Sequence, residues 1–173
     1  MPKIVPFLWF DGQAEQAAAH YTAIFPDSEV FGVTRYGPGT PGPEGTVMTV
    51  SFSLDGQRFV ALNGGPQFTF TEAISFQVLC EDQDEVDYYW ARLSEAGQQG
   101  PCGWLKDRFG VSWQVVPTVL LDLIDDPDPD RAQRTVQAML SMGKIEIIRL
   151  LQAAELAPGR GCGGCEVDNG AAG

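Results

Sequence analysis

The chain has 173 residues, of which 44% are hydrophobic and 20% charged, proportions typical of a globular domain rather than a disordered segment. Its formal net charge is −12, which repels phosphate backbones and anionic lipid surfaces, so we expect no binding to nucleic acid or membranes. No apolar run reaches the roughly 18 residues that a membrane span needs. The N-terminus has no signal-peptide layout, so we expect a cytoplasmic protein.

The N-terminal part of the chain predicts a strand, a helix and then three strands. Apolar residues from Ala14 to Phe25 recur at the spacing of one helical face. Asp55-Gly56 joins two strand-like runs and favours a tight hairpin. The expected elements lie at residues 4–10, 14–25, 29–36, 46–54 and 57–62.

The same order of elements returns about seventy residues later. Val86, Tyr89, Trp90 and Leu93 form a second helical stripe that ends at Gly97. A strand precedes this helix and a hairpin follows it, so each half reads βαβββ, and we expect an α+β fold. The expected boundaries are 1–120 for one domain with modules at about 3–66 and 73–118, 121–157 for C-terminal helices, and 158–173 for a flexible glycine-rich tail.

The most informative segment runs from Cys102 to Pro117 and predicts a hairpin. Its strands flank a turn that ends at Gly110, a residue that tolerates positive φ. Two tryptophans, a lysine and an amide in one hairpin suit the wall of a ligand pocket. The second strand alternates between two faces, with Val111, Trp113 and Val115 on one and Ser112, Gln114 and Val116 on the other.

Five segments together carry a family pattern. They are Pro6-Phe7-Leu8-Trp9-Phe10-Asp11-Gly12, Ala61-Leu62-Asn63-Gly64-Gly65-Pro66, Phe70-Thr71-Glu72-Ala73-Ile74-Ser75-Phe76-Gln77-Val78, Cys102-Gly103-Trp104-Leu105-Lys106-Asp107-Arg108-Phe109-Gly110 and Met142-Gly143-Lys144-Ile145-Glu146-Ile147. With the doubled βαβββ order, they resemble the PhnB-like branch of the vicinal oxygen chelate (glyoxalase/bleomycin-resistance) superfamily. That branch is often labelled a 3-demethylubiquinone-9 3-methyltransferase domain. The resemblance covers about residues 4–156.

The resemblance implies a cupped mixed sheet, usually completed in a homodimer, with a divalent ion in the cup of the metal-using branches. The ligand places of those branches fall near Ile4, Ala73, Gln114, and Ala61 or Asn63. Aliphatic side chains cannot coordinate an ion, and neutral amides bind transition metals poorly. We therefore expect no metal and no cofactor.

The methyltransferase label has no visible counterpart in the sequence motifs. S-adenosylmethionine enzymes of the usual α/β type need a glycine-rich strand-to-helix loop followed by an acidic ribose partner. The segment Gly37–Gly45 is glycine-rich, but no helix follows it. Whether the chain is an enzyme therefore stays open.

Strand alternation assigns the lining of the expected cup. The helix-facing set is Ile74, Phe76, Val78, Trp113 and Val115. The cup-facing set is Asn63, Ser75, Gln77, Ser112 and Gln114, joined by Leu8 and Phe10 from the first strand and by Trp104 as a stacking or packing residue. This lining suits a neutral or aromatic small molecule, and the alternative is an open sheet face with solvated polar side chains.

Two other functional hypotheses remain. One is an enzyme of transferase, lyase or dioxygenase type that acts in the same cup through Gln114, Gln77, Asn63 and Trp104 or a recruited metal. The other is a dimeric structural module with a vestigial cup. No paired carboxylates, Ser/His/Asp set or Cys/His pair is evident, which favours a binding protein.

Several single residues have alternative interpretations. Lys106 and Asp107 form either an acid–base pair or part of a turn, and we favour the turn. His20 is either a proton switch or a surface or packing residue, and we favour a surface or packing role. Trp9 and Trp113 are expected in the helix-facing core.

The C-terminal helices and the tail carry residues that we connect with homodimer formation and with metal or redox chemistry. We expect a homodimer because open sheet edges and apolar helix faces need cover. Its predicted contact is the stripe Ile147, Ile148 and Leu151. Cys162 and Cys165 form either a metal or redox clip or, as we favour, two thiols in a flexible tail.

Overall fold

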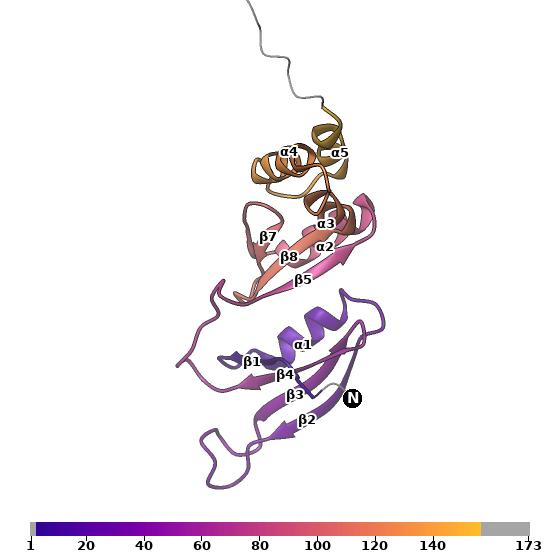
Figure 1. Ribbon diagram of the computed structural model, residues 1–173. Helices are drawn as coiled ribbons and strands as arrows, with labels where there is room; N and C mark the ends of the chain where they lie inside the picture. The colour runs from indigo at the N-terminus through magenta and orange to yellow at the C-terminus, as the bar shows by residue number, and fades with distance from the viewer. Residues whose placement is uncertain (1–2, 157–173) are drawn as a thin grey trace, which may run out of the picture.

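A computed structural model describes residues 3–156, and Figure 1 shows two sheets with one helix between them and a helical group at one end. The first sheet has the order β1-β4-β3-β2 and the second β5-β8-β7-β6. The first strand of each module pairs parallel with the last strand, and the other neighbours pair antiparallel. Each module therefore has βαβββ order, and the expected α+β fold is confirmed.

The first module contains β1 (Phe7–Phe10), α1 (Ala14–Thr22), β2 (Glu29–Arg35), β3 (Val47–Leu54) and β4 (Gln57–Asn63). The second contains β5 (Ser75–Cys80), α2 (Gln83–Ser94), β6 (Gln98–Gln99), β7 (Trp104–Lys106) and β8 (Ser112–Pro117). The C-terminal helices are α3 (Thr118–Ile124), α4 (Pro129–Leu140) and α5 (Ile147–Glu155). The predicted tail with Cys162 and Cys165 lies outside the described residues.

The β3–β4 hairpin turns at Asp55-Gly56, as its sequence predicts. The φ angles are 45° and 75° at these two residues, the left-handed pair that matches strand twist in a two-residue hairpin. Across the sheet, Leu8 pairs with Ala61 and Ala61 with Val50, and all three are buried beneath α1. The residues that alternate with these three along their strands therefore point to the opposite side, which is the open face of the first sheet.

The parity of β1 is opposite to our prediction. Leu8 and Phe10, expected in the cup, are 8% and 2% exposed and belong to the core. Trp9, expected in the core, points to the open face, where its Nε1 donates to the Gly65 carbonyl oxygen at 2.8 Å. The segment Phe-Leu-Trp-Phe is apolar at every position, so its alternation carries no information on which side is buried.

In the second sheet, the predicted alternation is confirmed. Phe76 and Trp113 are neighbours in register on the buried side, as are Val78 and Val115. Ser75, Ser112 and Lys106 form a row on the other side, as the pairing of β5, β8 and β7 requires. Ile74, expected to face the helices, is 75% exposed because it precedes the paired part of β5.

One hydrophobic core runs through both modules. Helix α1 lies between the sheets in Figure 1, and its Tyr21 ring lies 5.4 Å from Trp113 and 6.3 Å from Phe52. Phe25, just after α1, stacks on Trp113 at 5.6 Å. The modules therefore pack through their helix-covered sides and leave one face of each sheet open.

A buried carboxylate joins the modules. Asp107 is 3% exposed, and its Oδ2 accepts from the Tyr21 hydroxyl at 2.6 Å and from Trp113 Nε1 at 2.9 Å. Its Oδ1 accepts from the backbone N–H groups of Phe109 and Val111 at 2.8 and 3.0 Å. The turn role favoured for Asp107 agrees with these contacts, and its neighbour Lys106 pairs instead with Glu72.

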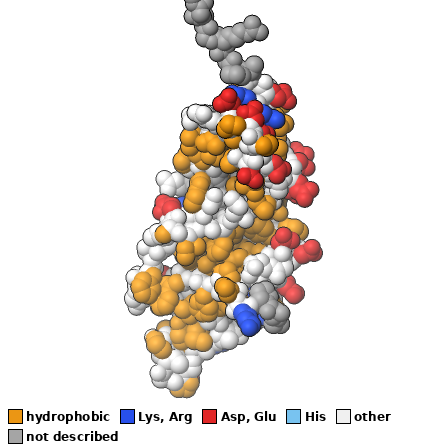
Figure 2. Space-filling view, in the orientation of Figure 1, with side chains coloured by type: hydrophobic (Ala, Val, Ile, Leu, Met, Phe, Trp, Pro, Cys, Tyr) orange, Lys and Arg blue, Asp and Glu red, His pale blue; other side chains and the backbone are white. Residues whose placement is uncertain are grey.

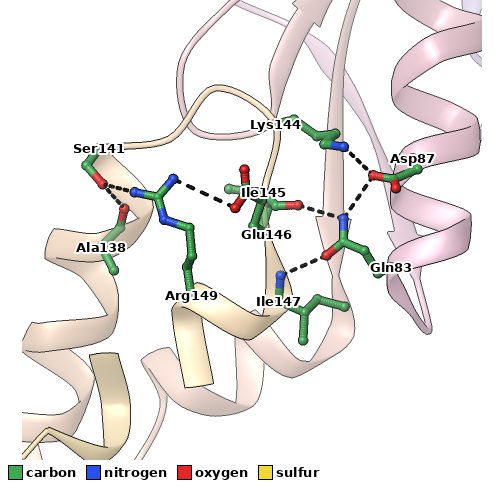
Figure 3. Close-up of polar contacts among 9 residues, drawn as sticks. All are labelled: Gln83, Asp87, Ala138, Ser141, Lys144, Ile145, Glu146, Ile147 and Arg149. Atoms are coloured by element: carbon green, nitrogen blue, oxygen red, sulfur yellow. Dashed lines mark hydrogen bonds and ion pairs between the residues drawn. The ribbon is translucent and has the colours of Figure 1, made fainter. Parts of the chain in front are cut away.

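The C-terminal segment docks on α2 through the amide of Gln83 and an ion pair at Asp87 (Figure 3). Gln83 Nε2 donates to the Ile145 carbonyl oxygen at 3.1 Å, and Gln83 Oε1 accepts from the Ile147 N–H at 2.8 Å. Asp87 accepts from both Gln83 and Lys144. Gln83 thus holds the start of α5 against the second module.

The helix α4 begins with a capping residue, and α5 buries one side. Asp128 caps α4 by accepting from the Asp130 N–H at 3.0 Å, with Pro129 at the first helical position. In α5, Leu150 is fully buried, whereas Ile148 of the predicted contact stripe is 61% exposed, and the role of this stripe in a homodimer stays a prediction. Within residues 3–156, no helix is long and apolar enough to cross a membrane.

Removing the Tyr21 hydroxyl tests the link between the modules. We expect Tyr21→Phe to lower the free energy of unfolding by about 1.5–3 kcal/mol, since it removes a hydrogen bond to a buried charged group. Tyr88→Phe is the matched control, because the Tyr88 hydroxyl donates to the neutral Ile24 carbonyl at a partly exposed place. Its expected loss is about 0.5–1.5 kcal/mol. Equal losses in urea denaturation would contradict the central role of Asp107.

A matched pair in α5 tests the packing of the C-terminal helices. Leu150→Ala should cost about 2–5 kcal/mol because it empties a buried site. Ile148→Ala should change stability by no more than about 0.5 kcal/mol. Denaturation curves recorded at low protein concentration measure both, and a larger effect at Ile148 would reverse our assignment of the buried face.

Candidate functional site

The open face of the second sheet brings together most of the predicted site residues. Two rows cross it in register, one of Ser75, Ser112 and Lys106 and one of Gln77, Gln114 and Trp104. Five of the seven predicted ligand-binding residues therefore share one surface. These five are Ser75, Gln77, Trp104, Ser112 and Gln114.

A pocket of about 290 Å³ opens at the β7 end of this face. Trp104 and Lys106 of β7 form one wall, and Ser112 of the neighbouring strand β8 also lines the pocket. Sequence reasoning missed the other walls, because the short β6 and the turn after it carry no distinctive pattern. The full lining is Glu72, Gln98, Gln99, Gly100, Pro101, Trp104, Leu105, Lys106 and Ser112.

The side-chain hydroxyl of Ser112 is in an unusual environment. The residue is 1% exposed, and its Oγ has no hydrogen-bond partner within the part of the chain that the structure describes. An unsatisfied buried hydroxyl costs free energy, and native proteins satisfy nearly all such groups. Ser112 is one of the residues that line the pocket, although its Oγ is itself covered.

The charges beside Ser112 neutralise each other. Lys106 forms an ion pair with Glu72, and this hydrogen bond lowers the pKa of the Glu72 carboxyl. Further along the face, Gln114 Nε2 donates to Ser75 Oγ at 2.8 Å. The surface around the pocket is thus polar and nearly neutral, with the Trp104 ring as its aromatic part.

Asn63 lies apart from this surface. Its Oδ1 accepts from the Ala14 N–H at 2.8 Å, which satisfies a free donor at the start of α1, and its Nδ2 donates to the Val47 carbonyl at 3.1 Å. Phe10 lies in the core, edge-on to Phe70 and Phe109. Neither residue is brought to the open face of the second sheet.

The C-terminal extension forms hydrogen bonds to the turn that precedes Trp104. The backbone N–H of Cys102 donates to the Met142 carbonyl at 2.8 Å, and that of Gly103 donates to the Gly143 carbonyl at 2.8 Å. A β-carbon on Gly103 would lie 2.6 Å from the Val115 carbonyl, so only glycine fits there. The turn before Trp104 is therefore held by the segment between α4 and α5.

The places of a superfamily metal site do not fit a divalent ion. Ile4 is 85% exposed and precedes β1, and Ala61 is buried beneath α1. The amides of Asn63 and Gln114 are neutral and already hydrogen-bonded. Among residues 3–156, no group of three or more His, Cys, Asp or Glu side chains is placed to hold a metal.

Two other groups near the core, His20 and Cys80, have shifted pKa values. Burial, followed by the charge of Arg108, lowers the pKa of His20, whose Nε2 has no partner among the described residues. Burial raises the pKa of the Cys80 thiol to about 12, so it stays protonated and unreactive at neutral pH.

Comparison with known families and structures identifies the fold. The family model described as 3-demethylubiquinone-9 3-methyltransferase matches residues 2–116. The chain belongs to this family. The resemblance to the PhnB-like branch is thereby confirmed, and the matched segment ends at β8, before α3.

Among solved structures similar to this chain, one that is 38% identical supports the assignment to the 3-demethylubiquinone-9 3-methyltransferase family. The putative 3-demethylubiquinone-9 3-methyltransferase, PhnB protein, from Bacillus cereus is 38% identical with a TM-score of 0.61, and the match covers 68% of this chain and 100% of that one. Protein PA1353 from Pseudomonas aeruginosa is 20% identical with a TM-score of 0.56 over 68% and 98%. The fosfomycin resistance protein FosX from Listeria monocytogenes is 14% identical with a TM-score of 0.46 over 68% and 93%. No curated protein matches the chain.

The lowered pKa of His20 predicts a pH dependence of stability. Since its folded-state value lies below the ordinary value of 6.5, the fold favours the neutral ring. This contribution is present above about pH 6.5 and is lost as the pH falls through the folded-state value. His20→Gln should therefore flatten the fall in the free energy of unfolding below pH 6.5. His20 is the one histidine of the sequence, so the carboxylates act alike in both proteins, and parallel curves would contradict the prediction.

Proposed function

We propose that the protein binds a neutral or aromatic small molecule on the open face of its second sheet, in the pocket beside Trp104. The observation that carries the proposal is the buried Ser112 Oγ, which has no partner within residues 3–156 and belongs to a residue that lines the pocket. A ligand that offers one hydrogen bond there removes the cost of an unsatisfied polar group. The unsatisfied hydroxyl of Ser112 thus favours the binding of a ligand in the pocket.

The lining of the pocket supports this ligand class. Trp104 and Pro101 offer an apolar surface that suits an aromatic ring. The ion pair between Lys106 and Glu72 leaves little net charge for an anion to bind. A flat molecule with one or two hydrogen-bonding groups meets both conditions.

We also propose that no resident metal takes part in this binding. The donor set argues for this, since the mapped positions supply aliphatic side chains and amides that are already bonded. The pair Lys106 and Glu72 does not form an activated acid or base, because each neutralises the other. Binding, rather than the methyl transfer named in the family description, is the activity that the pocket supports best.

A homodimer is part of the same proposal. The strands β1 and β5 are each at the edge of a sheet and are unpaired on one side. At the β1 edge, the apolar side chain of Phe7 is 59% exposed. A second copy that pairs with the β1 edge would cover it and extend the open face into a cup. The cytoplasmic location expected from the sequence stays a prediction.

Ser112→Ala tests the site without disturbing the fold. Because the hydroxyl has no partner in the described chain, its removal should change the free energy of unfolding by no more than about 0.5 kcal/mol or raise it. Binding of neutral aromatic fragments such as benzamide and indole should weaken several-fold, measured by NMR titration of the Trp104 indole signal. Benzoate, an anionic counterpart of benzamide, should bind more weakly than benzamide.

Ser53→Ala, on the open face of the first sheet, is the control and should leave binding unchanged. The proposal fails if neither benzamide nor indole perturbs Trp104. It also fails if the variants at Ser112 and Ser53 bind the fragments alike.

A further inference from the structure

A second cavity lies where the two modules meet, away from the pocket beside Trp104. It measures about 350 Å³ and is bounded by the end of α1, the tip of the β3–β4 hairpin, β5 and α2. Figure 2 shows hydrophobic side chains gathered over this junction, with acidic side chains at its edge. We call it the junction crevice. Its lining is Phe25, Leu54, Asp55, Gln57, Phe59, Phe76, Gln77, Val78, Leu79, Tyr89 and Trp113.

The inner wall of the junction crevice is aromatic. Phe25 stacks on Tyr89 at 5.1 Å and on Trp113 at 5.6 Å between ring centroids. Phe76 continues this wall, 5.3 Å from Trp113 and 5.2 Å from Phe59. Five rings from both modules therefore line one cavity and give it an apolar inner wall.

The rim of the junction crevice carries a carboxylate without a partner. The side chain of Asp55 forms no hydrogen bond or ion pair with any residue that the structure describes, although its backbone N–H donates to Ser28 Oγ. The Tyr89 hydroxyl likewise has no hydrogen-bond partner in residues 3–156. Burial raises the pKa of Tyr89, and the carboxylate of Asp55 is close enough to add to this effect.

The charges of the junction crevice have one sign. Its lining includes Asp55 but neither lysine nor arginine. The pocket beside Trp104 differs, because Lys106 and Glu72 neutralise each other there. The net charge of −12 adds a general attraction for cations.

We propose that the junction crevice binds a small organic cation, with its charged nitrogen near the Asp55 carboxylate and its apolar part against Phe25, Tyr89 and Trp113. An aromatic wall beside one carboxylate suits such a ligand, because the carboxylate attracts the charged nitrogen and the rings offer apolar contact to the rest of the molecule. The volume of about 350 Å³ accommodates a molecule of one ring and one ammonium group.

This binding does not depend on the site proposed above. The two cavities share no lining residue, so ligands of the two sites are expected to bind independently.

Benzyltrimethylammonium chloride is the probe for the test, and benzyl alcohol is its uncharged counterpart. Both are titrated into the full-length protein at low salt, and the amide signals of Gln57 and Gln77 are followed by NMR. We expect the cation to bind at least fivefold more tightly than benzyl alcohol. In Asp55→Asn, the affinity for the cation should fall at least fivefold, while that for benzyl alcohol stays the same.

Asp27→Asn provides a matched control. Asp27 and Asp55 have φ angles of 46° and 45°, and asparagine tolerates this conformation, so both variants should keep the fold. Asp27 does not line the junction crevice, and its variant should bind the cation as the parent does. Equal effects of the two substitutions, or equal affinity for the cation and the alcohol, would overturn the proposal.

Discussion

The arrangement of the whole molecule depends on the hydrogen bonds to one buried carboxylate. Asp107 accepts two bonds from its own turn and two from aromatic side chains, Tyr21 in the first module and Trp113 in the second. A buried charge must be satisfied by well-placed donors, so these groups are fixed relative to one another. Burial raises the pKa of Tyr21 well above 10.0, which keeps the donated proton in place.

Fixing the helix-covered sides against each other determines where ligands can bind. One side of β8 is committed to the core through Trp113, and the other side, with Ser112 and Gln114, faces away from this core, with Ser112 at the pocket beside Trp104. The two cavities follow from this division, because one lies on the open face and the other where the two modules meet at the core. The C-terminal helices, beyond the matched residues 2–116, stabilise the turn before Trp104 without closing the pocket.

The sequence predicted the second module better than the first. In β8, polar and apolar residues alternate, so its buried face could be assigned, whereas β1 is apolar throughout and gives no such choice. Asn63 was placed wrongly for a different reason, since its amide bonds to α1 and β3, contacts that only the tertiary fold creates. In α5, Ile147, Ile148, Leu150 and Leu151 are all apolar, and docking by Gln83 decides which of them are buried.

A double-mutant cycle measures the link between the modules most directly. Tyr21→Phe and Asp107→Ala are made singly and together, and the free energy of unfolding is obtained for all four proteins. We predict a coupling energy of about 1–3 kcal/mol, because Tyr21→Phe should cost little once its acceptor is gone. Additive losses would show that the hydroxyl and the carboxylate do not act on each other, and would contradict the account.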